Sequence, residues 1–156
     1  MIFISHRANL TGPKSAYFGE NHPDSIRAAL QAGFHLEIDI WYDDVQNSFA
    51  LGHDGPNYPI GIDFLSNDRF WVHCKNIEAL YRLKDHVLLN CFYHTNEDVV
   101  LTTKGILWHY PRKTKLTQRS IQVLPELVSD ISVQNILGVC TDYPIEFKKD
   151  LNFKMK

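Results

Sequence analysis

The sequence predicts a small α/β protein built around a parallel sheet. Short apolar runs with β-forming residues recur along the whole chain, separated by polar segments. The first runs alternate with segments of helical periodicity, which is typical of strand–helix–strand units. The chain has 156 residues, of which 44% are hydrophobic and 22% charged, as in an ordinary globular domain. We therefore expect a single domain over residues 1–147, followed by a basic C-terminal tail at 148–156.

Seven strands are expected from the apolar runs. They are Ile2–Ser5, Phe34–Ile40, Phe70–Lys75, Val87–Phe92, Gly105–His109, Ser120–Leu124 and Leu137–Thr141. The segment 99–102 is either an eighth strand or part of a return connection. Several connections in the second half are too short for regular helical crossovers. The periodicity thus supports a small α/β protein and does not by itself require a closed barrel.

Two helices are expected between the early strands. The first lies near 22–32, where Asn21 and Asp24 form a capping pattern and Gly33 ends the helical period. The second spans Asn76–Leu83 and has the same periodicity over a shorter length.

Charge and cysteine content narrow the function classes. The 16 basic and 18 acidic residues give a net charge of −2, so a general nucleic-acid binder is not expected. Cys74, Cys91 and Cys140 are widely spaced without a CxxC motif, and we expect reduced, buried thiols. No apolar run approaches the length of the hydrophobic region of a signal peptide or of a membrane-spanning segment. We expect a cytoplasmic protein without membrane insertion.

Two carboxylates fall on one face of an expected strand. In Leu36–Ile40, the period of two separates Glu37 and Asp39 from the apolar side chains. Two adjacent carboxylates raise the pKa of one of them or require a cation, and hard divalent ions prefer oxygen ligands. The alternative is an exposed strand face whose carboxylates contact water.

Histidines and a lysine supply further chemistry at strand ends. His73 and Lys75 share one face of another expected strand, and His6 and His53 end or follow apolar runs. Histidine titrates near neutrality and suits acid/base catalysis. Taken alone, a histidine is more often structural or a satisfied surface residue, and a lone lysine is more often a solvated charge.

Several motifs together resemble one enzyme family. They are His6-Arg7, Glu20-Asn21, Glu37-x-Asp39, Gly52-His53-Asp54 and Thr141-Asp142-Tyr143-Pro144, in this order. The order is similar to that of the glycerophosphodiester phosphodiesterases. The resemblance implies a compact, irregular TIM-type (β/α) barrel of the phospholipase-C-like phosphodiesterase type, with several short or missing helices. It places the site at the C-terminal ends of the strands.

The resemblance also implies roles for six residues. Family members cleave a phosphodiester with calcium or magnesium and two histidines, which accept and donate the transferred protons. The implied catalytic histidines are His6 and His53, the metal-binding carboxylates are Glu37 and Asp39, and the phosphate-binding cations are Arg7 and Lys75.

The sequence departs from the family pattern at two positions. The usual glycine after the arginine is Ala8, and the third metal-binding carboxylate is His73. Two carboxylates and an imidazole form a softer ligand set, which shifts preference from magnesium or calcium toward manganese, iron or zinc, or lowers affinity. The chain is also shorter than the roughly 200 or more residues usual for this barrel, so we expect an open site.

Some aromatic residues have two interpretations. His94 and Trp108 fall near strand ends and could line the mouth of the site, with Trp108 stacking on a sugar or glycerol substrate; ordinary packing is the alternative. Trp41 and Tyr42 follow Asp39 and either shield a metal or cover the end of the sheet.

Three polar residues outside the expected ligand set have a supporting or a local structural role. Glu126 and Asp142 either orient His6 or Lys75 or act in turns. Asn21 is expected to act as a helix cap.

The expected function is a metal-dependent phosphoric diester hydrolase acting on a glycerophosphodiester or a related sugar or glycerol phosphodiester. Its partner would be this small-molecule substrate. The alternative is a non-catalytic module that binds a sugar phosphate or phospholipid headgroup at a degenerate metal site. A transferase would use the same residues. Two proton-transfer groups beside a metal site favour the enzyme, and the natural substrate and the oligomeric state stay open.

Overall fold

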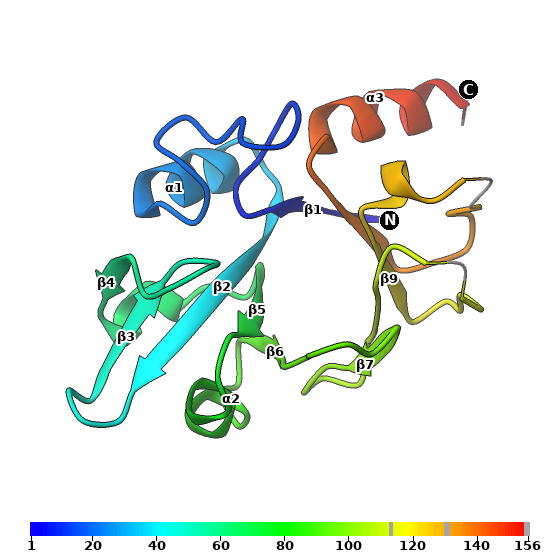
Figure 1. The fold of residues 1–156 in the computed structure, drawn as a ribbon. Helices are drawn as coiled ribbons and strands as arrows, with labels where there is room; N and C mark the ends of the chain where they lie inside the picture. Colours follow the sequence, from blue (N-terminus) through cyan, green and yellow to red (C-terminus); the bar gives the residue numbers. More distant parts are fainter. Residues whose placement is uncertain (113, 130–131, 155–156) are drawn as a thin grey trace.

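The computed structural model describes residues 1–112, 114–129 and 132–154. In this part of the chain, ten strands form one curled sheet and three α-helices lie outside the curl (Figure 1). The helices are α1 (Pro23–Gln31), α2 (Ile77–Leu83) and α3 (Pro144–Lys154). The strands are β1 (Ile2–His6), β2 (His35–Asp43), β3 (Ser48–Leu51), β4 (Tyr58–Ile60), β5 (Phe70–Cys74), β6 (Asn90–Phe92), β7 (Val99–Leu101), β8 (Leu107–His109), β9 (Ser120–Val123) and β10 (Gly138–Thr141).

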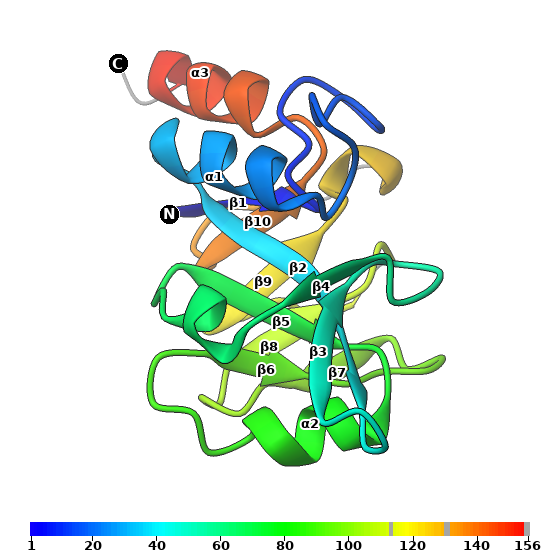
Figure 2. The same ribbon diagram turned by 90° about the vertical axis from the view of Figure 1, so that its left-hand side faces the viewer.

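Seven of the strands are parallel, in the spatial order β6-β5-β2-β1-β10-β9-β8. Figure 2 shows these strands crossing the molecule between α1 and α3 on one side and α2 on the other. β2 is long enough to pair with three strands. Its first residues pair with β1, its last residues pair antiparallel with β3, and β5 occupies the opposite edge. β4 extends the β3 hairpin, and β7 pairs antiparallel with β8.

The sheet is open, so the prediction of a closed TIM-type barrel is wrong. Among the described residues, no strand ladder joins β6 to β7 at the two ends of the curl. The backbone link found there involves Thr103, whose N–H donates to the Cys91 carbonyl at 2.8 Å while its Oγ1 accepts from the Cys91 N–H at 3.0 Å. β6, β7 and β8 have three residues each. The three α-helices of the described chain also contrast with the eight of a complete (β/α)8 barrel.

Most expected elements are present with shifted ends. All seven expected strands and both expected helices occur, and the segment 99–102 contributes the antiparallel strand β7. The hairpin β3–β4 and helix α3 were not expected from the sequence. The segment 148–156, expected as a tail, is helical through Lys154, and residues 155–156 lie outside the described part. No described helix is both long and apolar enough to cross a membrane.

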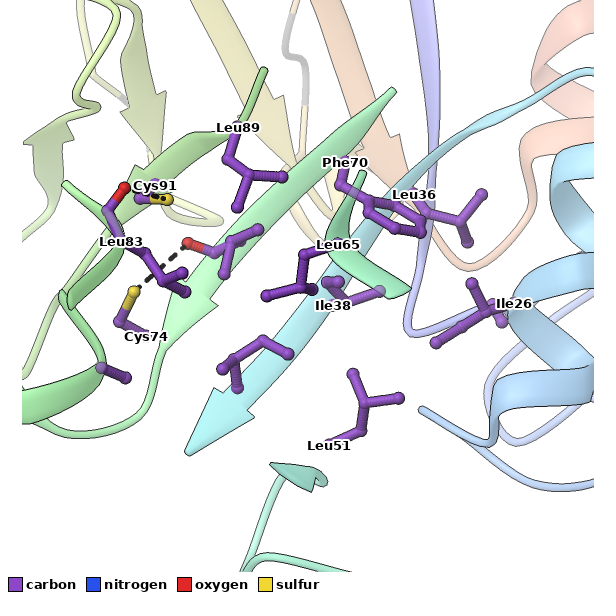
Figure 3. Packing of buried hydrophobic residues seen from close by; sticks show 14 of the residues in the cluster. Ile26, Leu36, Ile38, Leu51, Leu65, Phe70, Cys74, Leu83, Leu89 and Cys91 are labelled. Atoms are coloured by element: carbon purple, nitrogen blue, oxygen red, sulfur yellow. Dashed lines mark hydrogen bonds between the residues drawn. The ribbon is translucent and has the colours of Figure 1, made fainter. Parts of the chain in front are cut away.

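The sheet separates two apolar clusters. On the convex face, Leu36, Ile38 and Ile40 of β2 pack against α1, α2 and the β3 hairpin (Figure 3). The second cluster comprises Ile4, Trp71, Phe92, Trp108, Ile121, Val123 and Cys140, and alternation places its β1 member Ile4 on the same face as His6. The three cysteines are free and buried, as expected. Trp108 and Val123 of this cluster also line the cavity of the candidate site.

Candidate metal centre and surrounding site

Adjacent strands bring the predicted metal ligands together. The register pairs Glu37 with His6 and Asp39 with His73, and side-chain alternation directs all four toward the concave face. Ligand atoms of Glu37, Asp39 and His73 lie within 4.8 Å of one another. These three residues form a buried group that could hold a metal ion.

The carboxylates of this group fit a cation. Glu37 and Asp39 are 3% and 0% exposed, and Glu37 Oε2 has no hydrogen-bond donor among the described residues. Burial, together with the charge of Asp39, raises the pKa of Glu37 above its ordinary value. Since a buried oxygen without a donor is costly, a divalent ion would satisfy this atom.

His73 is held with its Nδ1 toward the carboxylates. This nitrogen lies 2.9 Å from Asp39 Oδ1 and 3.8 Å from Glu37 Oε1. The imidazole stacks on Phe92 with a centroid distance of 5.1 Å and an interplanar angle of 8°. Packing against Phe92 therefore fixes the ring in the orientation a ligand needs.

Two cations and a histidine also surround Asp39. Its carboxylate lies 3.2 Å from Arg7 Nε, 3.6 Å from Lys75 Nζ and 3.2 Å from His53 Nδ1. Burial alone would raise the pKa of Asp39, but hydrogen bonds from His53 and His73 and the charge of Arg7 hold it well below its ordinary value. Asp39 is therefore ionised at neutral pH.

His6 is oriented by a carboxylate on β10's C-terminal side. Its Nδ1 lies 2.8 Å from Asp142 Oδ1, which also accepts from Asn9 Nδ2 at 2.8 Å. The other ring nitrogen, Nε2, lies 4.0 Å from Glu37 Oε2. Burial alone would lower the pKa of His6, but the Asp142 hydrogen bond and the charge of Glu37 raise it. Of the roles left open for Asp142 by the sequence, the structure therefore shows a contact with His6.

His53 reaches the site from the turn after β3. Its side chain is 36% exposed, and its Nε2 lies 3.2 Å from Arg7 Nη2. The preceding residue, Gly52, has a φ of +146°, and a Cβ there would lie 2.1 Å from the Gly55 carbonyl oxygen. Glycine is therefore required for the turn that presents His53.

Asn21 is a supporting residue of the site and not the helix cap expected from the sequence. Its Nδ2 donates to Asp39 Oδ2 at 2.9 Å, and its Oδ1 accepts from the Asp39 backbone N–H at 2.9 Å. The cap of α1 is His22, whose Nδ1 accepts from the Asp24 N–H. An asparagine beside a helix start has the same sequence pattern in both roles, so periodicity could not separate them.

Glu126 supports the site from further away. Its carboxylate accepts from Thr141 Oγ1 at 2.9 Å and from the Asp142 N–H at 3.1 Å. It therefore fixes the backbone that carries Asp142, and it is Asp142 that contacts His6.

A small cavity of about 90 Å³ lies between these groups. Trp108 forms part of its floor, is 1% exposed and stacks on Phe92 at 4.5 Å, so the structure places it in packing contact. His94 stacks on Tyr110 at 3.6 Å, and burial together with the charge of His73 lowers its pKa to about 4. His94 is thus a neutral wall of the cavity. The lining comprises His6, Arg7, Glu37, His53, His73, His94, Trp108, Tyr110 and Val123.

No family model matches this chain, and neither a curated protein nor a solved structure matches it. The site itself combines oxygen ligands and an imidazole with two cations and two further histidines. Such a set can bind a metal ion, neutralise an anion and exchange protons.

Proposed function

We propose that the protein is a metal-dependent phosphoric diester hydrolase acting on a glycerophosphodiester or a related sugar or glycerol phosphodiester. The observation that carries the proposal is the meeting of the Glu37–Asp39–His73 group with His6, His53 and two cations, Arg7 and Lys75. Five of these seven residues, all except Asp39 and Lys75, line one small cavity. The order of the motifs, which resembles that of glycerophosphodiester phosphodiesterases, also supports it.

In this proposal the cations bind the diester. The Arg7 guanidinium and the Lys75 ammonium, both beside Asp39, would neutralise the phosphoryl oxygens. A divalent ion bound by Glu37, Asp39 and His73 would supply Lewis-acid stabilisation of negative charge on the non-bridging oxygens.

His6 and His53 would move the protons. One accepts a proton from water as the water oxygen bonds to phosphorus, and the other donates a proton to the leaving oxygen as its bond to phosphorus breaks. The products are a phosphomonoester and an alcohol. His6 would act through Nε2, because its Nδ1 is held by Asp142.

Single substitutions test this proposal. His6→Ala and His53→Ala should each lower turnover of a glycerophosphodiester or a chromogenic diester by about 10²–10⁴-fold in the presence of a divalent ion. His86→Ala, which lies outside the cavity lining, is the control. Circular dichroism checks that each variant is folded. Parental turnover in both histidine variants would reject the assigned roles.

One observation favours a second function. Asp39 already has Arg7, Lys75 and His53 as partners, so its charge is compensated without a metal ion. This supports a binding module for a sugar phosphate or phospholipid headgroup. Calorimetric binding of glycerol phosphate, with no turnover of any diester across manganese, zinc, magnesium and calcium, would select this alternative.

A further inference from the structure

An open groove of about 730 Å³ lies beside the candidate site. Its base is the part of β2 that continues beyond β1, where Ile40–Asp43 pair with β3. Figure 1 shows this end of β2 extending past the other strands, with β3 and β4 beside it. Neither the metal group nor the proton-transfer residues line this groove.

Trp41 connects the groove to the site. It follows Asp39 by two residues, so alternation places its side chain on the face that carries Glu37 and Asp39, about 6.6 Å further along the strand. Its Nε1 donates to the Gly52 carbonyl at 2.7 Å, which ties the indole to the turn carrying His53. The groove therefore begins where the bound part of a diester would leave the site.

The groove combines an apolar surface with hydrogen-bond acceptors. The register places Ala50 beside Trp41 and Pro59 beside Ala50, which extends the surface of the indole across β3 and β4. The carboxylates of Asp43 and Glu78 lie at its edges, and the lining contains no lysine or arginine. A negatively charged occupant is therefore disfavoured.

The acidic residues of the groove have hydrogen-bond partners only in part. Asp43 Oδ1 accepts from the backbone N–H groups of Val45 and Gln46 at 2.8 and 3.0 Å, and Asp44 lies 3.5 Å from Arg82 Nη2. The remaining oxygens of these residues and the exposed carboxylate of Glu78 can accept hydrogen bonds from hydroxyl groups. The groove therefore offers acceptors to an occupant that carries several hydroxyl donors.

We propose that this groove binds the alcohol portion of the diester and selects an uncharged ring polyol, a sugar or a cyclitol. The apolar face of the ring would stack on Trp41, and its hydroxyls would donate to the edge carboxylates. The proposal rests on the proposed function, because that function identifies the occupant as part of a phosphodiester.

Three matched diesters test the proposal: glycerophosphoinositol, glycerophosphocholine and glycerophosphoethanol. The native protein should show a kcat/KM for the inositol diester about fivefold to tenfold above that for the ethanol diester, with no comparable gain for the choline diester. Trp41→Ala should bring the inositol-to-ethanol ratio close to one. Trp41→Phe loses the bond to Gly52 but keeps an aromatic face, so it should retain most of the preference.

Two variants on α2 separate groove effects from general effects. Glu78→Ala removes an edge acceptor and should lower the inositol-to-ethanol ratio. Tyr81→Ala removes an exposed aromatic side chain of the same helix outside the groove lining, and it should leave the ratio unchanged. Equal kcat/KM values for the inositol and ethanol diesters, a preference for choline, or a ratio insensitive to Trp41→Ala would overturn the proposal.

Turnover and groove binding can fail separately. If no diester is hydrolysed, the proposed function fails, and calorimetric titration with glycerophosphoinositol then tests the groove alone. Binding that weakens about fivefold or more in Trp41→Ala would support the groove. No binding to the native protein would overturn it.

Discussion

Asp39 is the residue on which the contacts of the site converge. It is fully buried, and its partners come from four segments of the chain: the β1–α1 loop, the β3–β4 turn, β5 and the residue after β5. The sequence predicted Asp39, Glu37 and His73 because a strand period of two displays them on one face. It did not reveal Asn21 as a partner, because the loop that carries it contains left-handed residues such as Arg7 and Ala8, at φ of 53° and 70°. Such conformations have no periodic pattern.

Removal of the Asn21 side chain should destabilise the protein. Asn21→Ala leaves the buried Asp39 N–H and Oδ2 without this partner, and the free energy of unfolding should fall by about 1–3 kcal/mol more than in Asn135→Ala. The comparison is matched because both asparagines have left-handed backbones, at φ of 59° and 58°, and Asn135 is exposed. Urea unfolding measures both losses. Equal losses would show that the Asn21–Asp39 bonds contribute nothing.

His73 should set the metal preference. Calorimetry on the native protein should show tighter binding of zinc or manganese than of calcium, because one ligand is an imidazole. His73→Glu offers an oxygen ligand and should shift the preference toward calcium and magnesium. His86→Glu, which adds the same charge away from the site, is the control. Unchanged selectivity in His73→Glu would remove His73 from the ligand set.

The His6–Asp142 pair should make stability depend on pH. The pKa of His6 is raised above 6.5 in the fold, so its contribution is complete below that pH and is lost as pH rises through the folded-state pKa. The pKa of Asp142 is lowered below 3.8, so its contribution exists above that pH and is lost as pH falls through the folded-state pKa. The window of greatest stabilisation lies between these limits.

Asp142→Asn should weaken this dependence. Without metal, the free energy of unfolding of the native protein should fall between about pH 6 and about pH 8, and the fall should be smaller in the variant because His6 loses its charged partner. Urea unfolding with a chelator at both pH values provides the measurement. Parallel pH profiles for the two proteins would show that the pair does not couple to folding.

Among the elements, those with a long apolar pattern were predictable, whereas β4 and α3 were not. β2 alternates apolar and polar residues, and α1 has a clear apolar face over Ile26 and Ala29. In contrast, β4 contains Pro59, which sequence rules treat as evidence against a strand, although an edge strand tolerates it. In α3, polar residues are spread around the helix, so the sequence has only a weak helical periodicity of apolar residues. The one remaining sign of a helix in the sequence is Pro144, because proline favours the first position of a helix.

The β3–β4 turn should be sensitive to a single methyl group. Gly52→Ala would place a Cβ 2.1 Å from the Gly55 carbonyl oxygen, at a φ of +146°, so the turn must shift and His53 with it. We expect a loss of stability of about 1–3 kcal/mol and lower turnover. Gly61→Ala is the matched control, since its φ is −81° and nothing lies within 4 Å of the added atom. If both variants unfold at the same urea concentration as the native protein, the turn is not constrained in this way.

In the whole molecule, the formation of the candidate site does not depend on closure of the sheet into a barrel. The prediction of a closed barrel was wrong because closure requires pairing between short strands at the two ends of the curl, and strand length is poorly defined by apolar runs. Val87–Phe92, for example, forms a strand only at Asn90–Phe92. The candidate site lies instead on adjacent, well-paired strands, β1, β2 and β5. It is therefore preserved in an open sheet.

The most direct test of the account is metal-dependent stability. The free energy of unfolding of the native protein should rise by about 2.7 kcal/mol when manganese or zinc is present at one hundred times its dissociation constant. Glu37→Gln/Asp39→Asn should lose this gain. Asp43→Asn/Asp44→Asn, which removes two acids at the exposed end of β2, should retain it. Stabilisation of the Glu37→Gln/Asp39→Asn variant to the same extent as the native protein would contradict a metal centre at Glu37, Asp39 and His73.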